Sequence, residues 1–245
     1  MIAGALTSFL VDTEKDRPPD GYFHPSSLFQ CDRLAVYEQR AYEKSDTKKP
    51  EEHIPLRMGT LIHELLQASV THMADTERIQ EAWHEVKVII PDLMVTGSAD
   101  SLVLLADGTY EVEEFKSTKS SGIKYAKGGF TPKENHVNQG LTYVYGMRYF
   151  PWYTEHTMPD GTVETIKHAP LGGKLTKLRV TYFGKDAGEI LEFTYTITSE
   201  WEQWFVDYIR ILRDYEGLPA RKPEKDWLCK SYCAFRTRCW EADGE

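Results

Sequence analysis

Hydrophobic residues recur at helical spacing in four stretches of the chain, and each stretch predicts an amphipathic helix. The first begins near Pro25, and the second covers about residues 60–76 with Thr60 as its N-cap. The others cover about residues 134–150 and 199–217. The buried stripe of the second helix is expected at Met58, Leu61, Ile62, Leu65, Leu66, Ser69 and Met73.

Apolar and polar residues alternate in several other segments, which is the pattern of a half-buried strand. Strands are expected at 86–90, 93–105, 109–117, 177–183 and 190–197, and the last two should form a hairpin. This order of helices, a sheet, a further helix and more strands predicts an α/β or α+β fold in a single domain over residues 1–245, with a cysteine-bearing metal module appended to it.

The second and third of these strands are joined by a short turn that fixes their register. If the loop has three residues and ends at Gly108 in the left-handed region, Leu105 pairs with Thr109. Counting back along both strands then places Asp100 opposite Glu114. The loop length therefore predicts that two acidic residues meet at one end of the hairpin.

A lysine joins these acids on the same side of the strand. Glu114 and Lys116 are two residues apart and point the same way, whereas Glu113 points to the opposite face. Phosphodiester hydrolysis needs carboxylates that hold divalent metal ions, and it gains from a cation that stabilises negative charge in the transition state. Asp100, Glu114 and Lys116 would supply this set, although solvated charges at a strand end are the simpler interpretation of these residues taken alone.

The net charge of −9 argues against tight, non-specific coating of DNA and confines any DNA contact to a basic patch. The best candidate for that patch is the Gly- and Lys-rich segment after the catalytic strand, with Lys119, Lys124 and Lys127. A lysine run is usually a solvated surface, and the attachment of this run to the strand of Glu114 and Lys116 makes a lid that contacts phosphates an equal alternative. No apolar run is long enough to span a membrane and no signal peptide is recognisable, so the expected compartment is the cytoplasm.

The four cysteines are Cys31 near the N-terminus and Cys229, Cys233 and Cys239 near the C-terminus. Thiols stay reduced in the cytosol, so a metal site is favoured over two disulfides. Four thiolates are a complete ligand set for zinc or for an iron–sulfur cluster, and their number does not separate the two.

These features together resemble the RecB-like branch of the PD-(D/E)XK nucleases. Residues 57–64 are similar to the helix that carries the active-site histidine of that branch, here His63, and residues 139–143 match its Gln-x-x-x-Tyr motif. Ala99 stands where the family name has proline. The resemblance implies a restriction-endonuclease-like fold, with a mixed central sheet flanked by helices.

The resemblance also implies roles for individual residues. His63, Asp100, Glu114 and the carbonyl of Phe115 would bind the catalytic Mg²⁺ or Mn²⁺, and Lys116 would be the catalytic cation.

Gln139 and Tyr143 would line the site and contact the DNA strand. They are four residues apart and share one helical face, although Tyr143 could instead pack in the core.

The cysteine arrangement resembles the iron–sulfur members of this branch, which include the AddB nuclease domain and the small CRISPR-associated exonucleases. It implies a [4Fe–4S] cluster in a module formed by about residues 26–45 and 218–245, with zinc as the less favoured occupant. Three residues separate Cys229 from Cys233, one more than expected for such a site.

Two functions follow from this interpretation. The first is a metal-dependent DNA exonuclease that acts on single strands or duplex ends in recombination, repair or CRISPR-type DNA processing, with protein partners from those processes and self-association left open. The alternative is a module that binds DNA ends or assembles with a partner and has little cleavage of its own.

Overall fold

The fold is built on a mixed sheet in the computed structural model, which describes residues 9, 18–47, 50–119, 123, 131–186, 188–221, 229 and 233–241. Its strands lie in the order β5-β4-β1-β2-β3-β6-β7. The pairing of β3 with β6 is parallel, and the pairings between the other neighbours in this order are antiparallel. The strands are β1 (Glu81–Ile90), β2 (Val95–Leu104), β3 (Tyr110–Thr118), β4 (Trp152–Thr157), β5 (Val163–His168), β6 (Leu175–Gly184) and β7 (Ile190–Thr196).

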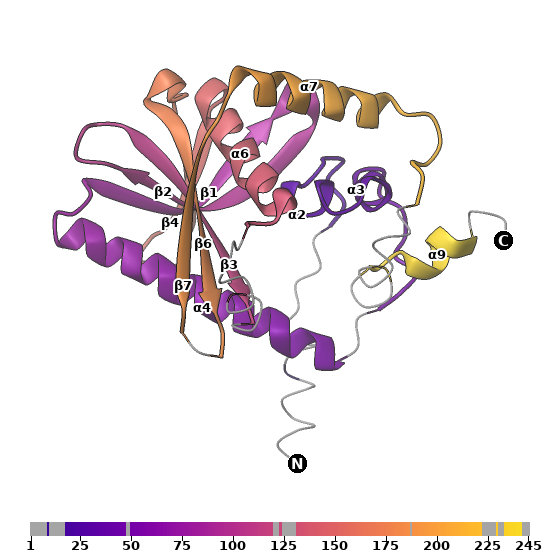
Figure 1. Ribbon diagram of the computed structural model, residues 1–245, viewed down its shortest axis with the longest axis horizontal. Helices are drawn as coiled ribbons and strands as arrows, with labels where there is room; N and C mark the ends of the chain where they lie inside the picture. Colours follow the sequence, from indigo (N-terminus) through magenta and orange to yellow (C-terminus); the bar gives the residue numbers. More distant parts are fainter. Residues whose placement is uncertain are drawn as a thin grey trace, which may run out of the picture.

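Helices cover both faces of this sheet. The long helix α4 lies on one side, and α6 and α7 lie on the other (Figure 1). The described helices are α2 (Pro25–Leu28), α3 (Asp32–Gln39), α4 (Pro50–Asp75), η1 (Pro91–Leu93), α6 (Glu134–Tyr149), η2 (Gly172–Lys174), α7 (Ser199–Asp214) and α9 (Arg236–Glu241). No helix in the described part of the chain has the length and apolar character needed to cross a membrane.

The main core lies between the sheet and α6. Leu141, Val144 and Met147 of α6 pack there against buried residues of the strands. The backbone of α6 comes so close to β1 that a Cβ atom at Gly146 would overlap the side chain of Val88. This close packing fixes the position of the helix that carries Gln139 and Tyr143.

Helix α4 is longer than the sequence predicted and packs along a different line. It begins at Pro50, so Thr60 lies inside the helix and is not an N-cap. Ile62 and Leu66 are buried as expected, but Leu61 is 44% exposed and Leu65 is 59% exposed. The predicted stripe was therefore too wide, because only one narrow ridge of α4 contacts the sheet.

The hairpin of β2 and β3 has the predicted register. Gly108 has a φ of 80°, and the backbone N–H of Leu105 donates to the carbonyl of Thr109 at 2.8 Å. The ladder pairs Ser101 with Glu113, and one further step places Asp100 opposite Glu114. The prediction from the loop length is confirmed.

Two other segments differ from the sequence-based expectation. The first predicted helix is divided into α2 and α3, which are separated by residues 29–31. The β4–β5 hairpin was not predicted, and β5 is exposed along almost its whole length. An edge strand that buries few side chains has no hydrophobic alternation by which to be recognised. The predicted hairpin of the last two strands, β6 and β7, is confirmed.

The C-terminal segment packs on α3 (Figure 1). Tyr37 stacks on Phe235 with ring centroids 5.1 Å apart. The guanidinium of Arg33 donates to the carbonyl of Pro219 at 2.6 Å and to that of Cys239 at 3.4 Å. These contacts bring Cys31, which precedes α3, into the same region as the C-terminal cysteines.

Candidate active site

The predicted acidic residues lie where β2 and β3 separate. The ladder between these strands ends at the pair of Ser101 and Glu113. Beyond it, a carboxylate oxygen of Asp100 accepts a hydrogen bond from the backbone N–H of Phe115 at 2.6 Å. The Asp100 side chain therefore takes the place of the next strand-to-strand contact and is fixed between the two strands.

Helix α4 supplies two side chains to Asp100 from one face of the sheet. His63 Nδ1 lies 3.2 Å from Asp100 Oδ1. Gln67, one helical turn later, donates to the Asp100 carbonyl at 3.1 Å and to Glu85 Oε1 at 2.8 Å. Burial of His63 lowers its pKa, but the hydrogen bond and charge of Asp100 outweigh burial, so the pKa lies above its ordinary value.

Helix α6 reaches the site from the other side. The Lys116 ammonium donates to Glu114 Oε1 at 2.5 Å and to Gln139 Oε1 at 3.1 Å. The Gln139 amide donates in turn to the Tyr143 hydroxyl at 3.4 Å. Tyr143 is only 3% exposed, so its ring packs in the core while its hydroxyl belongs to this chain of contacts.

Glu114 is the most buried of these charged groups, at 1% exposure. Burial, and then the negative charge of Asp100, raise the pKa of Glu114 to about 7, although Lys116 opposes the shift. Glu114 Oε2 has no hydrogen-bond partner among the described residues. Burial lowers the pKa of Lys116, but the charges of Glu114 and Asp100 outweigh it and raise this pKa above its ordinary value.

Beside these residues lies a cavity of about 500 Å³. Glu85, Lys87 and Ser98 line it together with Gln139 and Tyr143. This cavity, called here the groove, extends from Gln139 and Tyr143 towards the N-terminal segment, where Asp20 and His24 line it.

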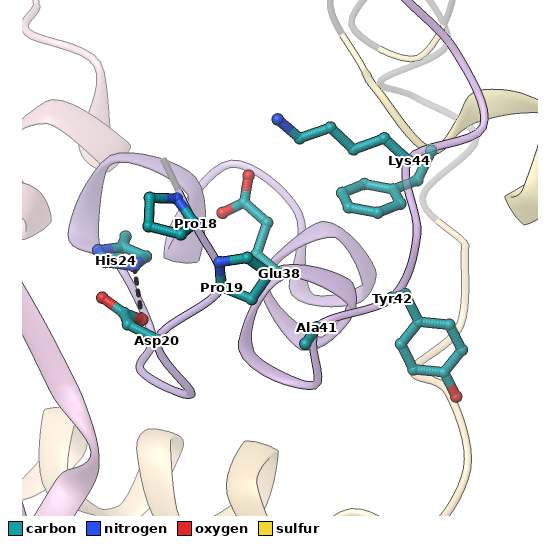
Figure 2. Close-up of a pocket in the computed structure, with 9 residues that line it drawn as sticks. Pro18, Pro19, Asp20, His24, Glu38, Ala41, Tyr42 and Lys44 are labelled. Atoms are coloured by element: carbon teal, nitrogen blue, oxygen red, sulfur yellow. Dashed lines mark hydrogen bonds and ion pairs between the residues drawn. The ribbon is translucent and has the colours of Figure 1, made fainter. Parts of the chain in front are cut away.

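A second cavity, of about 280 Å³, shares Asp20 and His24 with the groove. Figure 2 shows the ion pair of these two residues beside Pro18 and Pro19. Asp100, Glu114 and Lys116 line neither cavity, but Gln139, whose side chain contacts Lys116, lines the groove, so the groove is the better candidate for the substrate.

Comparison with known proteins agrees with this geometry. The sequence pattern of the PD-(D/E)XK nuclease superfamily matches residues 29–240. The chain belongs to the PD-(D/E)XK nuclease superfamily. The structure is also similar to one described as "Crystal structure of SSO0001", with a TM-score of 0.56 and 16% sequence identity over 98% of this chain and 96% of that chain. No curated protein matches the chain.

Membership implies that this PD-(D/E)XK protein is a nuclease with a generally metal-dependent mechanism, and Mg²⁺ or Mn²⁺ is typical of the superfamily. The residues present fit such an ion, because Glu114 Oε2 is a buried carboxylate oxygen without a partner among the described residues and Asp100 lies next to it. Within the described ranges, no three His, Cys, Asp or Glu side chains already stand together as a metal-binding group. Both carboxylate oxygens of Asp100 are hydrogen-bonded, one to His63 and one to the backbone N–H of Phe115, and Glu114 Oε1 accepts from Lys116.

The predicted lysines are only partly placed. Lys119 is exposed just beyond the end of β3, whereas Lys124 and Lys127 lie outside the described residues.

The four cysteines form no disulfide. Burial is the main cause that raises the pKa of Cys233 to about 11, and the charges of Cys229, Cys31 and Cys239 raise it further. The guanidinium of Arg33 lies 3.5 Å from Cys239 Sγ. Cys31, Cys229 and Cys239 therefore lie within electrostatic reach of Cys233, and the cation of Arg33 lies beside Cys239.

Sequence reasoning did not identify Gln67 and Glu85. Gln67 could have been found, because it is four residues after His63 and must lie on the same face of α4. Glu85 carries no such signal, since its place depends on the pairing of β1 with β2.

Proposed function

We propose that this chain is a metal-dependent DNA exonuclease that acts on single strands or on duplex ends. The observation that carries the proposal is the unpartnered, buried carboxylate oxygen of Glu114 among the described residues, next to Asp100 and beside the Lys116 ammonium. A buried charge without full compensation is costly in a protein that only needs to be stable. Such an uncompensated carboxylate is expected at a site where a cation binds during function.

The proposed roles follow from the contacts of each residue. His63, Asp100, Glu114 and the Phe115 carbonyl would hold Mg²⁺ or Mn²⁺, which, when bound, polarises the phosphate and lowers the pKa of a coordinated water. Lys116 stabilises the negative charge that develops on the phosphate.

Gln139 keeps the Lys116 ammonium in place through its 3.1 Å hydrogen bond. The two acids and the lysine are therefore positioned before substrate arrives, which reduces the reorganisation that the reaction requires.

The groove is the proposed path of the DNA strand. It begins at Gln139 and at the wall formed by Tyr143, and its lining is mainly polar. Lys119, Lys124 and Lys127 are proposed to contact backbone phosphates next to the cleavage site. A DNA strand whose end enters the groove and reaches the metal site would be cut from that end, as in an exonuclease. We propose that the enzyme acts in recombination, repair or CRISPR-type DNA processing. We also propose a cytoplasmic location and protein partners from those processes.

We further propose that Cys31, Cys229, Cys233 and Cys239 hold a [4Fe–4S] cluster, with zinc as the alternative. The module would join about residues 26–45 and 218–245 within a single domain. The proposal is supported by the charges of Cys31, Cys229 and Cys239, which act on Cys233, and by the cation beside Cys239. Iron, sulfide and zinc analysis of anaerobically purified protein distinguishes the two occupants.

The decisive experiment compares wild type with Glu114→Gln on end-labelled single- and double-stranded DNA in Mg²⁺, Mn²⁺ or EDTA. Glu64→Gln is the matched control, because Glu64 is an exposed glutamate beside His63. We expect wild type and Glu64→Gln to degrade DNA only with metal, while Glu114→Gln binds DNA without cutting it. The products from each labelled end then give the polarity.

Two results would contradict the proposal. Equal cleavage by wild type and Glu114→Gln would remove Glu114 from the catalytic site. Binding of DNA ends without cleavage under any metal, by both proteins, would favour the end-binding module instead.

A further inference from the structure

Helix α4 has a second apolar face outside its contact with the sheet. Ile54, Met58, Leu61 and Leu65 form this face, and their exposed fractions lie between 44% and 59%. Single exposed apolar residues are normal in proteins, but a continuous apolar stripe indicates a contact surface. The four residues are called here the α4 seam.

The seam has the spacing of a coiled-coil helix. Its members are four, three and four residues apart, so they form one row along about three turns. Ile62 and Leu66, which pack towards the sheet, each follow a seam residue directly and so point to a different side of the helix. The first turns of α4 extend past the sheet (Figure 1), and residues 54–58 are all exposed. Helix α4 thus presents one apolar row to the sheet and a second row to solvent.

Two opposite charges border the seam. Arg57 and Glu64 are seven residues apart along the same edge of it, and both are exposed. They are separated by about 10 Å along the helix axis, and neither has an ion-pair partner among the described residues. Charges beside an apolar seam are the feature by which coiled-coil helices select their partner and its direction.

We propose that the α4 seam is a self-association surface, on which a second copy of this chain packs its own α4 in the antiparallel direction. A twofold axis at residues 59–60 places Met58 against Leu61 of the partner subunit. The same axis places Ile54 against Leu65 of the partner subunit. Each contact occurs twice by symmetry, so the whole seam is covered in a single register.

The two charges favour a second copy and the antiparallel direction. In the same register, Glu64 of the partner subunit lies about 3 Å along the helix axis from the point opposite Arg57, which is within reach of an ion pair. Two such pairs form, one on each side of the axis. In a parallel pair of α4 helices, Arg57 and Glu64 would instead face the positions of Ile62 and Ser69, which carry no charge.

The chemistry of the seam disfavours DNA and lipid as its occupant. Arg57 is the one Arg or Lys between Ile54 and Asp75. DNA binding needs several cations that face phosphates, and helices that lie on membranes carry Lys and Arg along their polar face. A second α4 helix supplies the apolar row and the opposite charge that the seam requires.

The active site stays accessible in this dimer. His63 and Gln67 contact Asp100, and each follows a seam residue by two positions, so their side chains point to nearly the opposite side of the helix. The inference is therefore independent of the proposed function. One pair of helices buries less than the roughly 800 Å² per partner of a standard stable interface, so we expect a dissociation constant of about 1–100 µM.

The test is sedimentation velocity of the full-length protein from about 1 to 200 µM, which spans that range. Wild type should change from monomer to dimer. Leu65→Glu places a charge in the seam and should weaken the dimer by at least about 100-fold. Leu56→Glu is the matched control, because Leu56 is also exposed, at 46%, on the same helix but off the seam, and it should dimerise as wild type does. Both variants should keep the wild-type melting temperature at the lowest concentration, since both leucines are exposed.

A charge exchange tests the register. Arg57→Glu should weaken the dimer by about 10-fold, because two attractive pairs become repulsive. Glu64→Arg should have a similar effect. The double variant Arg57→Glu/Glu64→Arg restores both pairs, so its dissociation constant should lie within about 3-fold of wild type.

Several results would overturn the proposal. They are a wild type that stays monomeric across the whole concentration range, a dimer that Leu65→Glu leaves intact, and a double variant no stronger than either single exchange. Binding of wild type to anionic phospholipid vesicles, abolished by Leu65→Glu, would assign the seam to a lipid surface instead. The cleavage assay is separate: a dimer with this pattern supports the inference even if no DNA is cut, and cleavage by a strict monomer supports the proposed function alone.

Discussion

Glu113 and Glu114 are consecutive buried glutamates on opposite faces of β3, and their surroundings differ. Glu113 lies beside a cavity of about 280 Å³ between the sheet and α4, where Arg179 donates to it at 3.3 Å and to Glu111 at 2.8 and 2.7 Å. Glu114 has one bond, to Lys116, and a second oxygen without a partner among the described residues.

The comparison shows that a shifted pKa does not by itself identify a catalytic acid. Burial raises the pKa of both glutamates, that of Glu113 well above its ordinary value and that of Glu114 to about 7. The two glutamates differ in their hydrogen-bond partners. Arg179 presents several N–H groups to two glutamates, which is typical of a structural ion pair, whereas the Lys116 ammonium leaves one oxygen of Glu114 available.

The largest expected effect is on the rate of DNA cleavage, which should fall when Glu114 is replaced but not when Glu113 is replaced. Glu114→Gln should reduce kcat by about 10³-fold or more, because a metal-binding charge is lost. Glu113→Gln should stay within about 2-fold of wild type, since Glu113 lies on the opposite face of β3 and its partner is Arg179. Single-turnover cleavage of labelled DNA measures both. Similar losses in the two variants would contradict the assignment.

The next effect concerns stability, and here the larger loss is expected on the Glu113 side of β3, at Arg179, and the smaller one on the Glu114 side, at Lys116. Arg179→Met leaves the buried carboxylate of Glu111 without its cation, and we expect a loss of about 2–4 kcal/mol in the free energy of unfolding. Lys116→Met should cost less, because Glu114 can take up a proton near neutral pH. Urea denaturation of the metal-free proteins provides the measurement. A greater loss for Lys116→Met would reverse the comparison.

The third effect is a pH dependence of metal binding. The pKa of Glu114 is about 7 in the metal-free protein, so the carboxylate is protonated below that pH and the metal must displace the proton. We expect Mg²⁺ affinity to rise by up to about tenfold per pH unit up to pH 7 and to level off above it. Saturating Mg²⁺ should move the midpoint of the activity profile to lower pH. Glu114→Gln should remove this dependence, and a flat affinity between pH 5.5 and about 7 in wild type would contradict it.

The smallest expected effect belongs to Gln139. Its carbonyl oxygen accepts from Lys116, so Gln139→Ala should allow the ammonium to move and lower kcat by about 10-fold or less. Gln139→Glu serves as the comparison, because it retains an acceptor for Lys116. Recovery of activity in Gln139→Glu supports a positioning role, whereas an equal loss in both variants would assign the effect to DNA contact.

Local features of the sequence were sufficient to predict the hairpin at the centre of the site. A three-residue loop with Gly108 at its end permits one register, and that register brings Asp100 to the level of Glu114. Alternation along the strand placed Glu113 on the other face, and helical spacing placed Gln139 and Tyr143 together. These predictions hold because they depend on backbone geometry over a few residues.

Features that depend on distant contacts were decided by the tertiary structure. The apolar residues of α4 form a wide band, and only packing on the sheet decides that Ile62 and Leu66 are buried while Leu61 and Leu65 are exposed. The β4–β5 hairpin is held by ladder hydrogen bonds with little burial, so hydrophobicity does not reveal it.

The sequence by itself thus determined which acids meet on the β2–β3 hairpin, because loop length and side-chain alternation fix that register. Only the tertiary structure decided their surroundings: the interruption of the β1–β2 ladder at Glu85 and Asp100, the approach of His63 from α4, and the approach of Gln139 from α6. Those contacts join segments that are far apart along the chain. Their geometry is set by how two helices pack on opposite faces of one sheet, which no local pattern encodes.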